Sequence, residues 1–381
     1  MSSNSNDLTA LADEIAEFVR GPGERYAERI EQERAVPEEL WADLSDRGYL
    51  RLAAPEEYGG RGLPFDSYLE LLELFSMSHA SLRMIVHVCN GVWRSIDQLA
   101  SPEQRKRFVL PQVAGDIRVA FTLTEPTAGT GADLRSTVTR EGDTYYLSGE
   151  KHLITFGVNC DYWLLFARVD GTTGKDGTVA LMVDRNVAGV TVREMPETMG
   201  VRGTDHAYLT FDRSPVPVVN RLGEEGEGLG VALSGFLTPS RISVAMSCVG
   251  LARRAQELAV EHAGTRETFG KRLADRQSIR FALAENAADI EAARQLTLHA
   301  ARQWEGGDPE AATLSSMAKL TAVDMLTRVT DKALQVHGGI GYWQPNPIER
   351  VYRDARAQRF EEGTNEIQKT VIARAVMGGT R

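Results

Sequence analysis

The pattern of this sequence changes at Phe121-Thr122-Leu123-Thr124-Glu125-Pro126-Thr127-Ala128-Gly129-Thr130. Before this segment, apolar residues recur at the spacing of amphipathic helices, as they do from Leu8 to Phe18. After it come short β-rich runs such as Tyr162 to Val169, separated by glycine, proline or charged residues. The segment therefore marks the point where an N-terminal helical domain, residues 1–118, gives way to a small central β domain, residues 119–228. A barrel and a sandwich are both compatible with these runs.

Helical periodicity returns after the glycine-rich stretch Gly223-Glu224-Glu225-Gly226-Glu227-Gly228. Four amphipathic stripes follow, starting at Ile242, Ile279, Leu314 and Ile367. Such stripes with short connections are typical of antiparallel helix bundles. We therefore predict an α+β fold with an N-terminal α-helical domain, a central small β domain and a C-terminal four-helix bundle over residues 229–381.

The composition indicates a globular protein with a large core and restricts its partners. The chain has 381 residues, 42% of them hydrophobic, and a formal net charge of -10. An acidic surface repels nucleic acid and anionic membranes, so neither is expected as the main partner. The N-terminus lacks the pattern of a signal peptide, and no apolar run approaches the roughly 20 residues of a membrane-spanning helix. We expect a cytoplasmic protein.

Several common functional motifs are absent from the sequence. The three cysteines, Cys89, Cys160 and Cys248, form no CxxC pair, which argues against a disulfide framework and a zinc site. The histidines are scattered without an HExxH motif, so no metal site is predicted. No GxGxxG follows a strand, and Gly171-Thr172-Thr173-Gly174-Lys175-Asp176 is too short for a Walker A loop. A nucleotide cofactor therefore needs another kind of binding site.

The strongest functional signal comes from several segments taken together. Thr124-Glu125-Pro126 alone is more often only a turn, because tripeptides match by chance. Four further segments accompany it: Pro55-Glu56-Glu57-Tyr58-Gly59-Gly60, Arg266-Glu267-Thr268-Phe269-Gly270-Lys271, Gln335-Val336-His337-Gly338-Gly339-Ile340-Gly341-Tyr342, and Tyr352 to Gln368 with Glu362-Gly363-Thr364-Asn365-Glu366. In this order they resemble the acyl-CoA dehydrogenase family over nearly the whole chain. The resemblance implies an FAD enzyme that removes hydrogen from the α and β carbons of an acyl thioester.

The resemblance also implies which residues bind FAD. The matching positions in the β domain and beside the last helix are Phe121, Leu123, Thr124, Thr130, Leu153, Ile154, Thr155, Thr364 and Glu366. Thr155 matches a threonine that bonds flavin N5, and Leu153 stands where the family commonly has tryptophan. The matching positions expected to reach FAD from a neighbouring subunit are Arg266, Thr268, Phe269, Gln277, Gln335, Val336, Gly338 and Gly339. Without the resemblance, Gly338 and Gly339 are equally well read as a helix C-cap.

Glu362 is the predicted catalytic base. Taken alone, an acid just before a helix is a favourable N-terminal charge and nothing more. Within Glu362-Gly363-Thr364-Asn365-Glu366-Ile367-Gln368 it matches the residue that lifts the α-proton while hydride leaves the β-carbon for flavin N5. Some relatives carry the base just before an arginine that here is Arg241, and the residue at that position is Ser240. The neighbouring Glu361 is unusual; it either raises the pKa of the base or points to solvent, and we expect the second.

The resemblance is less specific about the substrate. Thr130, Gly363 and Arg241 match residues around the thioester arm, and departures near them leave open whether the carrier is coenzyme A or acyl carrier protein. Arg83 lies in an apolar helical stretch and resembles the arginine with which glutaryl-CoA dehydrogenases hold a substrate carboxylate. A buried cation needs an anion, so Arg83 either binds such a carboxylate, pairs with a structural acid, or extends to the surface.

Two other functions fit the same fold class. Flavin oxidases or oxygenases typically lack the base, so the presence of Glu362 favours dehydrogenation. A non-catalytic thioester-binding scaffold predicts decay of the flavin segments, which are largely intact. For the dehydrogenase we expect a homo-oligomer, most simply a homotetramer, and an electron-transfer flavoprotein as electron acceptor.

Overall fold

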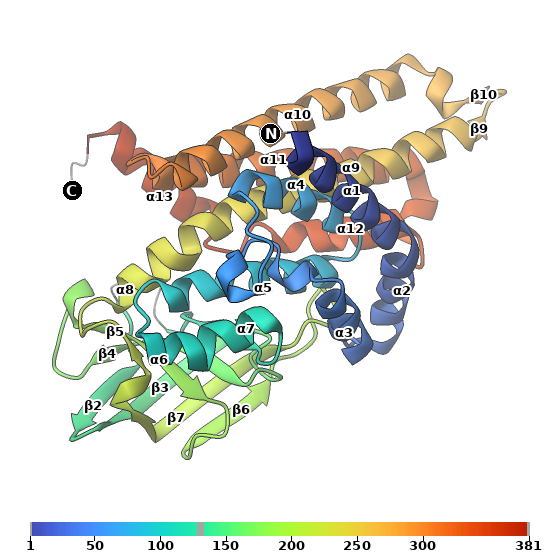
Figure 1. Ribbon diagram of the computed structural model, residues 1–381. Helices are drawn as coiled ribbons and strands as arrows, with labels where there is room; N and C mark the ends of the chain where they lie inside the picture. The colour runs from blue at the N-terminus through green and yellow to red at the C-terminus, as the bar shows by residue number, and fades with distance from the viewer. Residues whose placement is uncertain (1, 128–132, 379–381) are drawn as a thin grey trace.

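The computed structural model describes residues 2–127 and 133–378, and it has the expected order of helices, sheet and helices. Figure 1 shows the sheet at one end of the molecule and the long C-terminal helices at the other, with the N-terminal helices between them. The α+β class predicted from the sequence is thereby confirmed.

Seven α-helices precede the sheet in the described residues 2–118. They are α1 (Ser2–Phe18), α2 (Glu24–Glu33), α3 (Glu38–Asp46), α4 (Phe65–Phe75), α5 (Ala80–Asp97), α6 (Pro102–Gln104) and α7 (Leu110–Ala114). Most side chains of α5 are buried, and its Asn90 bonds the backbone of Tyr49 and Ala53 at 2.9 Å each. The last helix of this group ends at Gly115, whose φ of 87° is a left-handed C-cap that glycine adopts without strain.

The central sheet has eight strands, and β1 lies off the main path because it pairs only with β4. The strands are β1 (Val119–Thr122), β2 (Thr137–Glu141), β3 (Thr144–Thr155), β4 (Tyr162–Val169), β5 (Thr178–Asp184), β6 (Val190–Glu194), β7 (His206–Pro217) and β8 (Arg221–Leu222). Their order is β6-β7-β3-β2-β4-β5-β8. β1 and β2 run parallel to β4, and the other pairs are antiparallel. The sequence analysis left a barrel and a sandwich open; strands β1 to β8 form one sheet, with β6 and β8 at the ends of its strand order.

Strand β4 explains why this region did not alternate cleanly between apolar and polar residues. Leu164 and Phe166 pack in the core shared with α5 and α7, whereas Trp163, Leu165 and Ala167 pack in the core on the other face of the sheet. A strand that is covered on both faces reads as a continuous apolar run. The sheet is thus fastened to the N-terminal helices through one of its faces.

The C-terminal region is a helix bundle built around α11. Its helices are α8 (Gly228–Gly230), α9 (Thr238–Thr265), α10 (Gln277–Glu305), α11 (Ala311–His337), α12 (Pro347–Ala357) and α13 (Asn365–Val376). The four predicted stripes correspond to α9, α10, α11 and α13, and α12 is an additional helix against α9 and α11. In Figure 1, α9 and α10 form a long arm that ends in the hairpin of β9 (Glu267–Thr268) and β10 (Lys271–Arg272).

One expectation about apolar runs was wrong. The helical stretch Gly228–Thr265 is long and apolar enough to cross a membrane by length and composition. However, 72% of its most apolar window is buried inside the protein. A helix that is apolar on all sides is suited to the centre of a bundle, and that burial accounts for the composition of α9.

Candidate active site

Glu362 lies in the short connection between α12 and α13, in a backbone conformation that side chains seldom adopt. The φ angle is 53° at Glu362 and 95° at Gly363. A left-handed glutamate is strained, and such strain persists only where the surroundings hold the residue in place. The sequence therefore folds here into a sharp turn that presents Glu362 rather than continuing a helix.

Three side chains hold this turn by its backbone carbonyls. Lys319 of α11 donates to the carbonyl oxygens of Glu361 and Gly363. Gln368 of α13 donates to the carbonyl oxygens of Glu362 and Gly363 at 3.1 and 3.0 Å, and Arg241 of α9 donates to that of Glu362 at 3.2 Å. All three side chains belong to buried residues. Arg241 and Gly363, which we predicted to bind the substrate, thus lie at Glu362, and their contact with substrate stays a prediction.

The carboxylate of Glu362 is the end of a buried hydrogen-bond chain. Ser240 Oγ donates to Glu362 Oε1 at 2.8 Å, and His87 Nε2 lies 2.7 Å from Ser240 Oγ. Ser240 belongs to the first turn of α9 and His87 to α5. Two helices from different domains therefore meet at the predicted base.

The surroundings of Glu362 favour its protonated form more than water does. Burial, together with the negative charge of Glu361, raises the pKa of the Glu362 carboxyl to about 7, against the opposing effects of Ser240, Lys319 and Arg241. Burial lowers the pKa of Lys319 to about 8. A carboxylate with a pKa near the working pH is suited to general-base catalysis, because it is partly ionised and yet basic.

Arg83 and Glu361 form an ion pair beside the base. The Arg83 side chain is fully buried, and Nη1 and Nη2 bond Glu361 Oε2 and Oε1 at 3.0 and 3.1 Å. Burial alone would raise the pKa of Glu361, but the Arg83 guanidinium outweighs it and holds that pKa below its usual range. The expectation that Glu361 points to solvent was therefore wrong, because its carboxylate forms an ion pair with the buried Arg83 of α5. Glu361 is thus a structural acid that pairs with Arg83, one of the alternatives given by the sequence analysis. A contact of Arg83 with the substrate stays a prediction.

The segment that marked the change of fold is held together by another buried ion pair. Lys151 Nζ lies 2.8 Å from Glu125 Oε1 and donates to the Leu123 carbonyl at 3.0 Å. Glu125 also accepts the backbone N–H groups of Arg135 and Ser136 at 2.6 and 3.0 Å. The backbone around Thr124 is thus rigidly placed at the end of β1. Thr130, predicted to touch both flavin and substrate, lies outside the described residues.

The β-domain positions predicted for FAD differ in exposure. Phe121 stacks on Phe236, the ring that precedes α9, with centroids 4.4 Å apart. The β3–β7 ladder has an irregularity between Lys151 and Ile154, and Leu153 has a φ of 57°. This bulge turns Leu153 outward, so that 53% of the residue is exposed. Side chains of Leu123, Ile154 and Val336 are buried in cores, so any contact with a cofactor is through their backbone.

The second group of predicted FAD residues lies far from Glu362 in the same chain. Ser240, which bonds Glu362, is at the start of α9, whereas Arg266 follows its last residue; the 28 residues of α9 span roughly 42 Å at 1.5 Å per residue. The C-terminal end of α11 lies at the same remote end, since the rings of His337 and His262 are stacked at 4.5 Å. The start of α9 carries both Ser240, which bonds Glu362, and the preceding Phe236, which stacks on Phe121. One chain therefore brings Glu362 to the same end of α9 as strand β1, but not the groups around Arg266 and Gln335.

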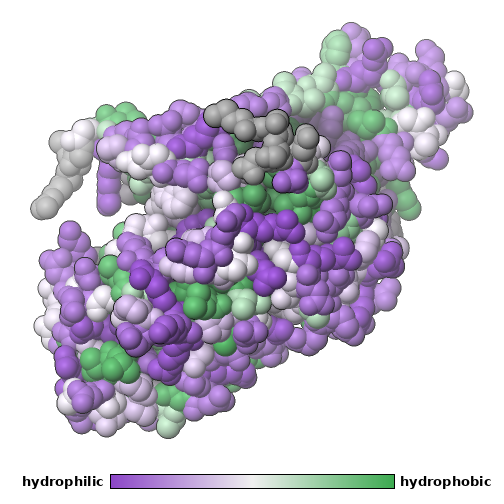
Figure 2. All heavy atoms as spheres, in the orientation of Figure 1, coloured by the Kyte–Doolittle hydropathy of each residue, from purple (hydrophilic) through white to green (hydrophobic). Residues whose placement is uncertain are grey.

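The remote group has the properties of a site for an anion supplied from outside the chain. Arg266 is exposed, and its guanidinium pairs with no acid in the described ranges 2–127 and 133–378. Gly338 and Gly339 have open space where a Cβ would stand. Gly338 is the C-cap of α11, which confirms the alternative interpretation for this glycine, and its contact with FAD stays a prediction. Hydrophobic side chains nearby include Val260, Phe269 and Phe281, which are 50%, 97% and 57% exposed, and Figure 2 shows hydrophobic patches on the visible face of this arm.

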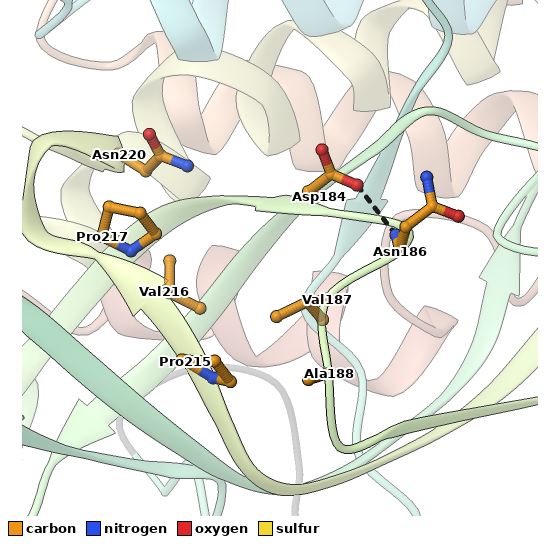
Figure 3. Close-up of a pocket in the computed structure, with 8 residues that line it drawn as sticks. All are labelled: Asp184, Asn186, Val187, Ala188, Pro215, Val216, Pro217 and Asn220. Atoms are coloured by element: carbon orange, nitrogen blue, oxygen red, sulfur yellow. Dashed lines mark hydrogen bonds between the residues drawn. The ribbon is translucent and has the colours of Figure 1, made fainter.

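A hollow on the β domain is unrelated to Glu362. It has a volume of about 350 Å³ and is lined by Asp184, Asn186, Val187, Ala188, Pro215, Val216, Pro217 and Asn220. Figure 3 shows Pro215 and Val216 of β7 on one side and Val187 and Ala188 on the other. Asp184, the one ionisable lining residue, bonds the backbone N–H of Asn186 at 2.8 Å. This arrangement is a turn and supplies no base, nucleophile or cation.

Comparison with known proteins decides the family. Models of the acyl-CoA dehydrogenase N-terminal, middle and C-terminal domains match residues 5–116, 120–214 and 226–377. The chain belongs to the acyl-CoA dehydrogenase family. It is 35% identical to an acyl-CoA dehydrogenase of Bacillus subtilis (strain 168) over 368 residues, which cover 96% of this chain and 97% of that protein.

Two solved structures extend this result to the fold. Butyryl-CoA dehydrogenase from Megasphaera elsdenii has a TM-score of 0.91 at 33% identity, over 98% of this chain and 97% of that one. A structure described as an electron transferring flavoprotein of Acidaminococcus fermentans has a TM-score of 0.92 at 32% identity, over 97% and 98% of the two chains. As a member of this family the protein is an FAD-dependent oxidoreductase acting on acyl-CoA.

The residues of this acyl-CoA dehydrogenase fit FAD in two places. The exposed Leu153, Thr155 two residues further along β3 and the backbone around Thr124 offer an apolar face and hydrogen-bonding groups. The exposed guanidinium of Arg266, which pairs with no acid among the described residues, and the open backbone of Gly338 and Gly339 suit a diphosphate. Thr364 precedes α13, and Glu366 is exposed in the first turn of that helix.

Sequence reasoning missed three residues of this site: His87, Lys319 and Gln368. His87 was read only as part of an apolar helix, and a histidine there is more often a core residue. Lys319 directly follows Ala318 of the apolar stripe of α11, and a lysine beside such a stripe was the signal available from the sequence. The structure shows that this lysine is fully buried, which is unusual for lysine. Lys319 and Gln368 bond the turn around Glu362, and His87 reaches Glu362 through Ser240. These contacts cross between elements, and the spacing of residues along the sequence does not report them.

Proposed function

We propose that this acyl-CoA dehydrogenase uses the Glu362 carboxylate to remove the α-proton of its acyl-CoA substrate. The observation that carries the proposal is the turn itself: Glu362 is held at a φ of 53° and has a pKa raised to about 7. Ionised Glu362 takes the proton, and FAD supplies the hydride acceptor for the β-hydrogen. The backbone ties to Lys319, Gln368 and Arg241 keep the carboxylate in place during the reaction.

The acyl group is proposed to be short and without a charge. The similarity to a butyryl-CoA dehydrogenase supports a short chain. The pairing of Arg83 with Glu361 supports an uncharged one, because both Nη atoms of the guanidinium already bond a carboxylate. Coenzyme A is favoured over acyl carrier protein, since the relatives compared above act on coenzyme A esters by name.

Three further features complete the proposal. The distance between Glu362 and Arg266 along α9 supports an oligomer in which a neighbouring copy completes the FAD site. The similarity to a chain from structural work on an electron transferring flavoprotein supports such a protein as the electron acceptor. The three free cysteines are compatible with a reducing compartment such as the cytoplasm.

Anaerobic flavin reduction tests the central claim. The FAD-loaded protein is mixed with straight, branched and carboxylated acyl-CoA thioesters, and bleaching of the flavin absorbance is recorded. Glu362→Gln is expected to keep FAD and to lose roughly 10² to 10⁴-fold in the rate of reduction, the usual contribution of a general base. Glu285→Gln, a surface change in an exposed ion pair with Lys332, is the matched control. Bleaching of Glu362→Gln at the parent rate would contradict the proposal.

A further inference from the structure

The hydrogen-bond chain from His87 through Ser240 to Glu362 has a direction. Ser240 has one hydroxyl proton and donates it to Glu362 Oε1 at 2.8 Å. Its oxygen can then only accept from His87 Nε2, 2.7 Å away, so that nitrogen carries the ring proton. The other ring nitrogen, Nδ1, is buried and has no hydrogen-bond partner among residues 2–127 and 133–378. This assignment leaves Nδ1 as a bare acceptor, which costs less than a buried N–H without a partner.

The direction of the chain is locked by the charges around it. Burial and the neighbouring Arg83, one turn earlier on α5, lower the pKa of His87 to about 3, so the ring stays neutral. Reversing the hydrogen-bond chain would require a proton on His87 Nδ1, which no acceptor in the described part of the protein reaches. Ser240 therefore cannot receive a proton from Glu362 Oε1 without stranding a buried donor.

The two carboxylate oxygens of Glu362 are consequently unequal. Oε1 accepts from Ser240, whereas no donor in the described part of the chain reaches Oε2. Glu362 is partly exposed, and Oε2 is not fully enclosed. The groups that act on the charge of Glu362 are Glu361, Lys319 and Arg241, with Ser240 as hydrogen-bond donor; Arg83 and His87 stand behind Glu361 and Ser240.

We propose that Ser240 and His87 are positioning residues that keep Oε1 of Glu362 as a hydrogen-bond acceptor and reserve Oε2 to take the proton from the substrate. The inference rests on the proposed function of Glu362. In the step, the α C–H bond breaks and an O–H bond forms at Oε2. The C–H electron pair enters the Cα–Cβ bond, and the β-hydrogen leaves with its own electron pair for FAD. Ser240 stands at the position where some relatives carry the base, and in this protein it orients Glu362.

The test compares variants of the FAD-loaded protein over a range of pH. Ser240→Ala removes the bond to Oε1, and His87→Leu removes the donor behind it. His87→Gln restores an N–H donor on an uncharged side chain. Ser247→Ala is the matched control, because Ser247 is equally buried in α9 but bonds only the backbone of Ser243. FAD content and circular dichroism establish that each variant is folded and loaded.

A positioning role predicts two separate effects in flavin reduction. At high pH, where Glu362 is ionised in every variant, Ser240→Ala slows reduction roughly tenfold, about the effect of one hydrogen bond to a charged group. At low pH the loss is larger, because without the Ser240 donor the pKa of Glu362 rises and less of it is ionised. His87→Leu shifts the profile in the same direction, and His87→Gln restores the parent profile.

Several results would overturn the inference. An unchanged pH profile in Ser240→Ala would show that the serine does not act on the base. An equal loss in Ser247→Ala would indicate a general effect of α9, and a parent-like profile in His87→Leu would remove His87 from the chain. In each of these cases Glu362→Gln is measured alongside. If Glu362→Gln reduces flavin normally, the proposed base is wrong; if it is inactive, only the positioning role has failed.

Discussion

Arg83 and Glu361 lie 278 positions apart in the sequence and form a bidentate ion pair, with Nη–Oε distances of 3.0 and 3.1 Å. Glu361 immediately precedes the proposed base Glu362. The Arg83–Glu361 ion pair therefore sets the net charge beside the Glu362 carboxylate. Glu361 by itself raises the pKa of Glu362. Arg83 in turn neutralises Glu361, and without that cation an unpaired, largely buried carboxylate would remain beside the base.

Breaking this pair from one side should destabilise the protein. Arg83→Met and Glu361→Ala are each expected to cost roughly 3–5 kcal/mol in the free energy of unfolding, because each leaves an unpaired buried charge. The double variant should recover much of this loss. Urea denaturation followed by circular dichroism measures the three variants. The exposed pair Arg213–Glu141 is the control, for which removal is expected to cost no more than about 1 kcal/mol.

The same pair should control the response to charged substrates. With Glu361 present, a carboxylated acyl-CoA is expected to reduce the flavin no faster than a neutral acyl-CoA of equal length. Glu361→Ala frees the Arg83 guanidinium, and we expect a relative gain of roughly tenfold for the carboxylated substrate, the worth of a charge-assisted hydrogen bond. Anaerobic reduction rates for both substrates provide the ratio. A parent preference for the carboxylated substrate that Arg83→Ala abolishes would instead establish Arg83 as a substrate anchor.

The pH dependence of the reaction should follow Glu362. The carboxyl must be ionised to accept a proton, and its pKa is raised to about 7. Below that pH the kcat/KM of the free enzyme is expected to rise about tenfold for each pH unit, and above it to level off. Initial rates at low substrate concentration, measured from about pH 5 to about pH 9, report the pKa of the free enzyme. A profile that is flat through neutral pH would argue against Glu362 as the titrating base.

FAD retention should depend on the remote end of the bundle. Arg266→Ala is expected to weaken FAD binding roughly tenfold or more by removing a charge-assisted contact to the diphosphate. Arg272→Ala, on the same exposed hairpin but paired with Asp275, should have little effect. Flavin remaining after dialysis measures both variants. Sedimentation of the parent should give a dimer or tetramer with bound FAD, and a monomer that keeps its flavin would contradict the shared site.

The sequence by itself determined the order of helices, sheet and helices and the position of the candidate base. Hydrophobic periodicity is a local property, so the change at Phe121 and the stripes of the bundle were readable without tertiary information. Glu362 could be predicted as the base from the sequence because its motif, Glu362 to Gln368, is one contiguous segment. Leu153 was found in the same way, although only the bulge in β3 explains its 53% exposure.

The tertiary structure alone decided which charged and polar groups meet. Glu361 was expected in solvent, and its pairing with Arg83 depends on how α5 packs against the turn before α13. Ser240 and Glu362 are 122 positions apart, and His87 joins them from another domain. Strands β1 to β8, which a local pattern could assign to a barrel or a sandwich, form one sheet, because strands far apart in the sequence, such as β3 and β7, pair through hydrogen bonds. Burial and long-range contact set the charge, the pKa and the orientation of a side chain, and neither is encoded in the spacing of residues along the chain.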